Sequence, residues 1–586
     1  MKHAKAEGLL AAGLVAALGA AMALTGCGSD AGLGQIGTST TVSDGGAVVC
    51  ESSYAGLEDD AIVKWIKSTV YNVDKQESVY EDIQEQQADC TLSSPLIVYN
   101  PFGTNAQSLY VYFDTERAAT TSYTVSVSDE EAATISDDSF TADSIPDFKR
   151  TVEDESSLAH EFLVTGLIPG VENEVTIQVV YDKPDDDNVG KESITFSVDM
   201  CDVLGDEELQ LVSEEGSSDQ ELEDGLYAVL GNEESEGADY IYFYDSDGFL
   251  RGEVPIIGDR TQRLVFEDDA MYFGADNTTI AAMSDIGQIV KLFEIDGQGD
   301  TDYHLHHDTV SDGNGHLMVL ASDFNTDTVE DLVLFLNEET GDVDYVLDMG
   351  DLLPDFKEDT VAYYNENVDP DDPPQTFDGE DGVDWIHLNS VQWMGNDTVL
   401  VSSRQTSSIM KISNVSSEPV LEYIVGPEEI WEGTGYEDLV YDKEGDFLIN
   451  GGQHSVEYVE DDSLPDGQYY AIMFDNNVGI STGVTSGFDY SSIGLTHVEG
   501  TTDEEGVYSY YYKYLIDENE GTFELAESFE VPYSGYCSSV QDVNGNVVVN
   551  SGMAGVFGEY TADGELIRSF EMECESLIYR ICKYDL

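Results

Sequence analysis

Two kinds of apolar spacing divide the chain. Between residues 57 and 83, apolar side chains recur every three or four residues, which is typical of an amphipathic helix. These positions are Ile62, Trp65, Ile66, Thr69, Val70 and Val73. From residue 95 the pattern changes to short alternating runs, which predict β-strands. Gly, Pro and Asp separate the runs within residues 95–200, so we expect a small antiparallel β-sandwich there.

After residue 200 the chain repeats one unit, in which an Asn/Asp/Gly turn joins two apolar strands. The turns are Asp245-Ser-Asp-Gly248, Asp312-Gly-Asn-Gly315, Gly395-Asn-Asp397, Glu444-Gly-Asp446, Asp542-Val-Asn-Gly545 and Ala562-Asp-Gly564. Such turns predict β-hairpins, and radial repetition of antiparallel sheets makes a β-propeller. We therefore expect an all-β chain. A short helical segment and a sandwich precede a propeller of about six blades over residues 201–586.

The first 26 residues have a different pattern. Lys2 and Lys5 precede an apolar run, Leu9 to Leu24, that ends at Leu24-Thr25-Gly26-Cys27. This order is typical of an export signal, and the run is short for a membrane span. Its ending resembles the lipobox of bacterial lipoproteins, so we expect lipid on Cys27 and a membrane-anchored chain outside the cytoplasm. We expect residues 27–94 to be a tether followed by the helix. The alternative for the first residues is an ordinary cleaved signal.

The charge balance narrows the range of partners. The chain has 22 Lys and Arg against 120 Asp and Glu, a net charge of −98. It lacks the clustered basic residues that phosphate backbones require, which argues against a nucleic-acid partner. Six cysteines remain beside Cys27, and outside the cytoplasm they permit disulfides. Cys50 with Cys90 and Cys574 with Cys582 are two such pairings, and the connectivity stays open.

Candidate chemistry is concentrated in the histidines. All except His3 and His160 lie between Tyr303 and Val498. Three segments stand out, together with one arginine: Tyr303-His-Leu-His-His-Asp308, Asp384-Trp-Ile-His-Leu-Asn-Ser390, Gly452-Gln-His454 and Arg404. Each alone is ordinary for a structural residue. The inner strands of a propeller line one axis, however, so together they offer a nucleophile, oxyanion donors and an acid.

The same segments resemble the bacterial aryl-sulfate sulfotransferases. The resemblance also includes the sandwich, and it keeps the family's order along the chain. Its sandwich motifs are Asn100-Pro-Phe-Gly-Thr104, Leu109-Tyr-Val-Tyr-Phe113, His160-Glu-Phe162 and Gly166-Leu-Ile-Pro-Gly170, and Phe474-Asp-Asn476 follows the histidine motifs. It implies a six-bladed propeller with an N-terminal sandwich.

The resemblance also implies roles for individual residues. His454 is expected to be the nucleophile, and His387, Asn389 and Arg404 are expected to contact the sulfuryl oxygens. His306 or His307 would supply a further catalytic histidine, as the imidazolium that protonates the leaving phenolate. Period-two alternation favours His306 with Asp308 on the channel face.

The implied activity is sulfuryl transfer from a phenolic sulfate ester to a phenolic acceptor, by a ping-pong mechanism through a sulfohistidine. No nucleotide or other cofactor is expected. A metal-dependent propeller hydrolase is one alternative, against which Arg404 argues because a cation beside a metal is unfavourable. A non-catalytic binding propeller is the other. The physiological donor and acceptor stay open, as does the oligomeric state, with a homodimer as one alternative.

Overall fold

The computed structural model describes most of the chain after residue 38. The described residues are 39–50, 59–135, 145–152, 156–182, 190–205, 207–232, 237–267, 269–368, 382–479, 487–497, 506–574 and 576–585. The expected signal and Cys27 lie outside them. Within the described ranges, no helix is long and apolar enough to span a bilayer.

The predicted helical segment is present but interrupted. It consists of α1 (Asp59–Trp65), the π-helix η1 (Ile66–Val70) and α2 (Val73–Gln84). The first part ends at Val70, and Asn72 caps the second, because its side chain accepts the backbone N–H of Lys75 at 3.0 Å. Trp65 and Ile66 are buried in one core with apolar residues of the first two propeller blades.

The N-terminal β domain is built around one long strand. Its strands are β1 (Ser39–Thr41), β2 (Ala47–Val49), β3 (Leu96–Tyr99), β4 (Leu109–Ser126), β5 (Phe148–Thr151), β6 (Ser157–Val164), β7 (Glu172–Tyr181) and β8 (Lys191–Asp199), with α3 (Asp129–Ile135) after β4. The first half of β4 pairs with β3 and β6, and its second half with β5 and β7. One strand thus serves both layers of the sandwich. The pairing of β2 with β8 is parallel, an exception to the expected antiparallel pattern.

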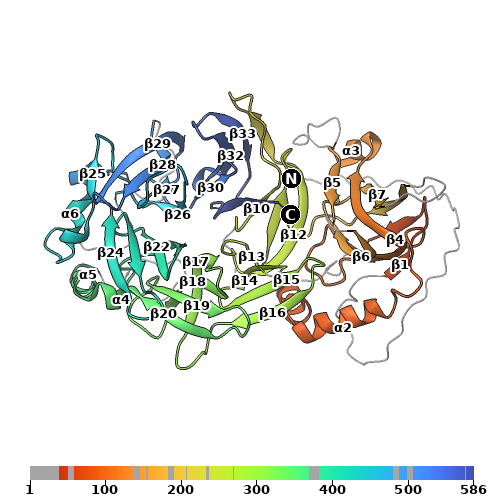
Figure 1. Cartoon of the computed structure of the whole chain (residues 1–586), viewed down its shortest axis with the longest axis horizontal. Helices are drawn as coiled ribbons and strands as arrows, with labels where there is room; N and C mark the ends of the chain where they lie inside the picture. The colour runs from red at the N-terminus through yellow and green to blue at the C-terminus, as the bar shows by residue number, and fades with distance from the viewer. Residues whose placement is uncertain are drawn as a thin grey trace, which may run out of the picture. The chain divides into compact units, whose positions relative to one another are not determined.

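Six further sheets form a six-bladed propeller, which confirms the predicted fold class (Figure 1). The first three blades, each written from the axis outward, are β34 (Ile581–Tyr584), β10 (Leu226–Val229), β11 (Ala238–Tyr244) and β12 (Leu250–Ile257); β13 (Val265–Glu267), β14 (Ala270–Asp276), β15 (Thr279–Ser284) and β16 (Ile289–Glu294); and β17 (Tyr303–Ser311), β18 (His316–Asp323), β19 (Leu332–Asn337) and β20 (Val343–Asp348).

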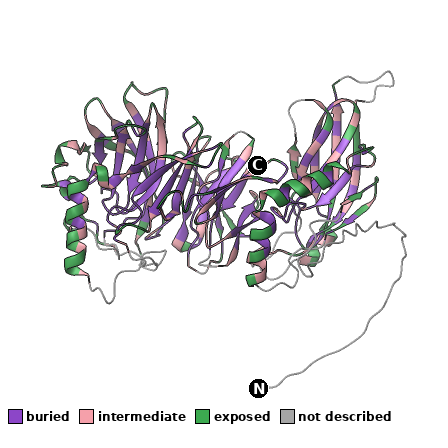
Figure 2. Ribbon diagram, turned by 90° about the horizontal axis from the view of Figure 1, so that it is seen from below, coloured by how far each residue is buried: buried purple, intermediate pink, exposed green. Residues whose placement is uncertain are grey.

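The fourth to sixth blades are β21 (Leu388–Gly395), β22 (Thr398–Ser403), β23 (Ser408–Ser413) and β24 (Val420–Val425); β26 (His454–Val459), β27 (Gln468–Asp475), β28 (Tyr508–Asp517), β29 (Thr522–Pro532) and β25 (Asp442–Glu444); and β30 (Ser539–Val543), β31 (Asn546–Ser551), β32 (Val556–Thr561), β33 (Leu566–Glu571) and β9 (Val212–Glu215). Short helices lie between strands: α4 (Met349–Leu352), α5 (Pro354–Asn367), α6 (Glu428–Trp431), η2 (Glu437–Leu439), η3 (Tyr490–Ile493) and η4 (Gly552–Ala554). Figure 2 shows that the blades are largely buried strands, whereas the helices are largely exposed.

Each end of the propeller segment adds a strand to a blade formed by the other end of the segment, and this closes the ring. The C-terminal strand β34 is innermost in the first blade, and β9 completes the outer edge of the last. An ion pair joins these two blades, since Lys583 Nζ lies 2.8 Å from Glu559 Oε2 with both side chains fully buried. The hydroxyl of Tyr227 donates to the same carboxylate at 2.8 Å. The closure therefore depends on polar groups with no access to water.

The six described cysteines lie as free thiols, so neither pairing considered from the sequence is formed. Cys50 directly follows β2, and Cys90 lies after α2. Cys582, a member of the other pairing, is buried in β34. The hydroxyl of Tyr99 lies 2.8 Å from the sulfur of Cys201 instead.

Candidate active site

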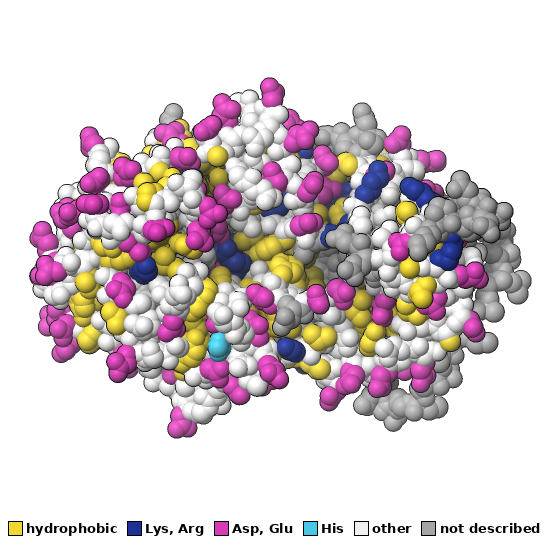
Figure 3. Space-filling view, viewed as in Figure 1, with side chains coloured by type: hydrophobic (Ala, Val, Ile, Leu, Met, Phe, Trp, Pro, Cys, Tyr) yellow, Lys and Arg dark blue, Asp and Glu magenta, His cyan; other side chains and the backbone are white. Residues whose placement is uncertain are grey.

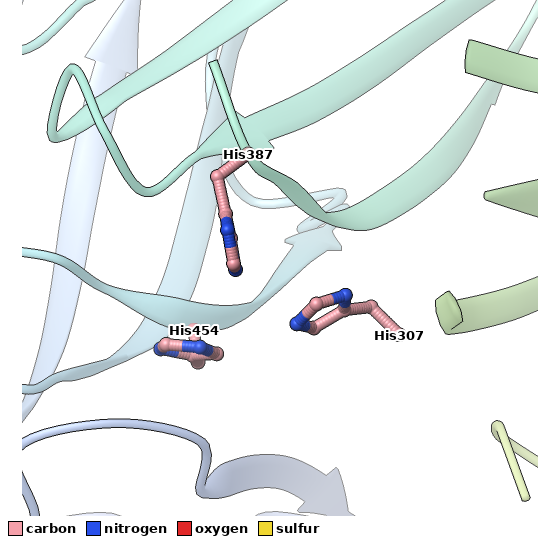
Figure 4. Close-up of side chains that lie close together, drawn as sticks. All are labelled: His307, His387 and His454. Atoms are coloured by element: carbon pink, nitrogen blue, oxygen red, sulfur yellow. The ribbon is translucent and has the colours of Figure 1, made fainter. Parts of the chain in front are cut away.

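Three histidines from consecutive blades meet at the propeller axis (Figure 4). His307 lies in β17, His387 directly precedes β21, and His454 begins β26. The ring centroids are 4.8 Å apart for His307 and His387, 6.2 Å for His307 and His454, and 6.4 Å for His387 and His454. All three side chains are buried. We call them the histidine cluster.

Irregular inner strands place these side chains. Leu305 pairs with Ala321 and Thr309 with Val319, so three residues of β17 face a single residue of β18. His307 has a φ of +50° and His387 one of +51°, a conformation uncommon outside glycine that marks functional sites when the surroundings maintain it. Alternation therefore fails at this point. The expectation that His306 faces the channel is wrong, because the bulge turns His307 toward the other two histidines.

His306 lies behind His307. The two Nδ1 atoms are 3.0 Å apart and share one hydrogen bond. Burial lowers the pKa of His306 to about 3, and it lowers the pKa of His307 well below its usual range. Both rings are therefore neutral at physiological pH, and His306 supports its neighbour.

His454 presents a free ring nitrogen to the cluster. Its Nδ1 lies 3.1 Å from the carbonyl oxygen of Gly452 and 2.8 Å from Oδ1 of Asn476. Both partners are acceptors, so Nδ1 carries the hydrogen and Nε2 keeps its lone pair. Asn476 is itself fixed, since its Nδ2 donates to the carbonyls of Ser534 at 2.9 Å and Cys537 at 3.0 Å. Burial, with the nearby Arg404, holds the pKa of His454 well below its usual range.

His387 has the opposite charge state. Its Nδ1 lies 2.7 Å from Oδ2 of Asp384 and also contacts Glu330. Burial alone would lower the pKa of His387, but the two carboxylates outweigh it and raise this pKa to about 9. His387 is therefore the imidazolium of the cluster at neutral pH. We expected that charge on His306 or His307, but burial dominates the pKa of both rings, and the small raising effect of Asp384 on His306 does not offset it.

Arg404 closes one side of the cluster. It follows β22, and its backbone N–H donates to the carbonyl of His387 at 3.0 Å. It lines a small pocket together with Gln405, Ser407, Gly452, Val478, Gly479 and Tyr490. Gln453 fixes the loop that carries His454 to the same blade, since its Nε2 donates to Ser402 Oγ at 2.9 Å and to the carbonyl of Ser403 at 3.1 Å. One blade thus positions both Arg404 and the histidine opposite.

The two predicted substrate-binding residues hold the inner strands together. Asn389 donates from Nδ2 to the carbonyl of Gln453 at 2.7 Å. Asp308 lies beyond the bulge of β17, and its Oδ1 accepts Arg580 at 2.5 Å and Arg263 at 3.3 Å. Both side chains are fully buried. The structure does not bring the carboxylate of Asp308 into the cluster, and the sulfuryl contact of Asn389 stays a prediction.

Comparison with known proteins decides the family. A family model described as Arylsulfotransferase (ASST) matches residues 211–580, which is more than half of the chain. A second, described as Arylsulfotransferase Ig-like domain, matches residues 96–195. The chain belongs to the arylsulfotransferase family. This confirms the resemblance, and the family supports an aryl sulfotransferase activity in general.

More distant comparisons add little to this assignment. No curated protein matches the chain. Among solved structures, the WD40 domain of coronin from Toxoplasma gondii is 10% identical, with a TM-score of 0.29 over 62% of this chain and 76% of that one. BamB from Moraxella catarrhalis is 12% identical, with a TM-score of 0.29 over 64% and 96%.

Several residues of this arylsulfotransferase site had no role assigned from the sequence. Asp384 and Asn476 stood in the motifs without a role, although Asp-x-x-His spacing could have signalled the first. Glu330 and Tyr579 had no signal, because they reach the site from the irregular segments that precede β19 and β34. Tyr579 donates from its hydroxyl to the carbonyl of His307 at 2.8 Å. The guanidinium carbon of Arg260 lies 4.9 Å from the Tyr579 ring centroid, and its charge further lowers the pKa of His307.

Proposed function

We propose that this protein transfers a sulfuryl group from an aryl sulfate to a phenol, without a nucleotide, and that His454 carries the group between them. One observation supports this most directly. His454 is neutral with a free Nε2, while the neighbouring His387 is held as a cation by two carboxylates. A nucleophile and an acid thus coexist in one cluster, with their pKa values moved apart by different surroundings.

In the first step, the Nε2 lone pair of His454 attacks the sulfur of the donor. An N–S bond forms and the S–O bond to the aryl group breaks, so the departing phenolate takes the bonding pair. His387 gives this oxygen its proton, because an imidazolium of pKa about 9 can protonate a phenolate whose conjugate acid has a pKa of about 10. Arg404 stabilises the negative sulfuryl oxygens, for which its planar, permanently charged fork is suited.

In the second step, the acceptor phenol occupies the place that the first phenol has left. Neutral His387 removes the phenol's proton, and the phenolate attacks the sulfur. The N–S bond breaks and its electron pair returns to Nε2. The sum is one aryl sulfate and one phenol exchanged for another pair, with no net change in protons. The same imidazole acts as acid and then as base, as a ping-pong reaction requires.

The acidic surface makes the positive charge of Arg404 important for binding an anionic donor. Figure 3 shows acidic side chains spread over one face of the molecule and few basic ones. Such a surface repels an anionic donor, so positive charge has to be supplied locally at the site. Arg404 and Arg260 both act on the histidines electrostatically, since the first lowers the pKa of His454 and the second that of His307.

The test uses a chromogenic aryl sulfate with no nucleotide present. Donor alone should turn over slowly, and an added phenol should raise phenolate release and yield a new aryl sulfate. After brief exposure to donor at mildly alkaline pH, peptide mapping should find one sulfuryl adduct on His454. Replacing His454 with Ala should abolish adduct and transfer, whereas the control His316→Asn, in an exposed ion pair of the third blade, should keep both.

Three results would contradict the proposal. Release of inorganic sulfate without any effect of phenol would indicate a hydrolase. An adduct on another histidine would move the nucleophile. Chromogenic donors that bind without any turnover would favour a binding propeller.

A further inference from the structure

We infer that His307, His387 and His454 also form a binding site for a single zinc ion, and that bound zinc excludes the aryl sulfate. Zinc binding itself does not depend on the proposed function, whereas the exclusion does.

The first support is the geometry of the cluster. One ring nitrogen of each histidine lies within 4.8 Å of those of the other two, and all three side chains are buried. Zinc–nitrogen bonds of about 2.0–2.1 Å in a tetrahedral site place neighbouring nitrogens about 3.4 Å apart. The rings must therefore move inward by only about an ångström. Three imidazoles with an open fourth position are an established ligand set for zinc.

The second support is the set of groups behind the rings. A metal-ligating histidine donates its other N–H to a carboxylate, a carbonyl or a similar acceptor, which fixes the ring and makes it a better ligand. His387 has Asp384 and Glu330 at its Nδ1, and His454 has Gly452 and Asn476. His307 has His306 at 3.0 Å, and when His307 donates in that bond its Nε2 lone pair is free. Each ring thus has a partner for Nδ1.

Charged side chains of both signs lie near the histidine cluster. Arg404 and Arg260 oppose a cation, and they act on the same histidines. The buried carboxylates of Asp384 and Glu330 stand directly behind His387 and offset them. Binding also requires His387 to release its proton, which removes one positive charge as the metal adds two. Two buried carboxylates and two guanidinium groups thus act on the cluster with opposite signs.

The functional consequence follows from a shared atom. Nε2 of His454 cannot hold zinc and attack sulfur at the same time, and zinc-bound His387 has no proton to give. Zinc should therefore inhibit transfer in competition with the donor, and a chelator should restore it.

The experiment uses the full chain without a histidine tag, stripped with a chelator. Millimolar Mg²⁺ is present to occupy the many surface carboxylates, because Mg²⁺ prefers oxygen ligands. Zinc per chain is measured after gel filtration, and Co²⁺ is added in parallel because its visible absorption reports tetrahedral nitrogen ligands. We expect one zinc per chain in the wild type, and at least tenfold weaker binding in His307→Gln and His387→Asn.

Two further variants sharpen the result. His316→Asn removes a histidine outside the cluster that lies 3.0 Å from both Asp312 and Asp344, and it should leave zinc binding and transfer unchanged. Asp384→Asn leaves the ligands in place but removes a carboxylate behind one, and should weaken binding about 10–100-fold. Circular dichroism confirms that each variant is folded.

The possible results separate the two proposals. Zinc in the wild type equal to that in folded His307→Gln, or zinc that Mg²⁺ displaces, overturns the site. Full transfer by the zinc-loaded chain overturns the exclusion. Transfer without zinc binding overturns this inference and leaves the proposed function standing. Stoichiometric zinc in a chain that never transfers sulfuryl groups, even when metal-free, supports the site and contradicts the proposed function.

Discussion

The orientation of His454 rests on Asn476, and Asn476→Leu tests this dependence. Leucine has a similar size but cannot accept the Nδ1–H of His454, which the amide oxygen accepts at 2.8 Å. The Gly452 carbonyl at 3.1 Å remains, so the ring keeps one acceptor. As His454 gains the sulfuryl group its ring becomes positive, and the lost bond would then be charge-assisted. Such bonds contribute about 1.5–3 kcal/mol against about 1 kcal/mol for a neutral one.

The difference of about 0.5–2 kcal/mol is the loss of transition-state stabilisation. It predicts that kcat/KM for the donor falls about 2- to 30-fold, with less sulfohistidine formed in a fixed time. In ping-pong kinetics this quantity reports the first step alone, so the acceptor does not affect it.

The matched control is Asn550→Leu. Asn550 is also a buried amide and donates to the carbonyl of Ile578 at 3.0 Å, yet it makes no hydrogen bond to His454. Both variants should lose stability, since each leaves buried carbonyls without a donor, but only Asn476→Leu should lose rate. If folded Asn476→Leu keeps the wild-type kcat/KM, the orientation that we assign to His454 is wrong.

Three further predictions concern other parts of the chain. Lys583→Met leaves Glu559 buried without its partner and should cost about 3–5 kcal/mol in urea unfolding, whereas Lys149→Met at an exposed pair should cost less than about 1 kcal/mol. Burial raises the pKa of Asp475 from 3.8 to about 7, so the stability present below pH 3.8 is lost as the pH rises to 7. Asp475→Asn should therefore gain up to about 4 kcal/mol over the wild type between pH 4 and pH 8. Mass spectrometry of protein from its host should find lipid on Cys27; a mature chain cleaved elsewhere would contradict that expectation.

The fold could be predicted from local features that recur. Asp312-Gly-Asn-Gly315 and Asp542-Val-Asn-Gly545 do join paired strands, because their Gly residues adopt positive φ at no steric cost. Glu444-Gly-Asp446 does not, since no second strand follows and the chain instead enters the loop that carries His454. A turn motif signals a reversal, but not whether the next apolar run finds a strand to pair with. The alternation is also interrupted within a single strand, β4, by the polar residues at its middle, where it passes from pairing with β6 to pairing with β7.

The site could be predicted only as far as its motifs extend. Motif order identified His454, His387 and Arg404 as neighbours, and blade geometry explains why they are. Whether His306 or His307 joins them depends on a bulge, which changes the side-chain face without leaving a sequence signal. The charge states of the three histidines could not be predicted from the sequence either. His387 is cationic because Asp384 and Glu330 converge on one nitrogen, and Glu330 comes from the preceding blade, 57 residues earlier in the chain.

The irregular inner strands connect these observations. In a regular inner strand every second residue points toward the axis. The inner strands of three neighbouring blades depart from this pattern, with positive φ values at His307, His387 and Ser455, and the ring nitrogens of the cluster lie within 4.8 Å of one another. That close approach costs backbone strain and would force like charges together if all three rings were protonated. Burial keeps two rings neutral, and the carboxylates hold the charge on the third. The Nε2 lone pair that would make His454 a nucleophile is also the one that we propose as a zinc ligand, so the two proposals share one atom.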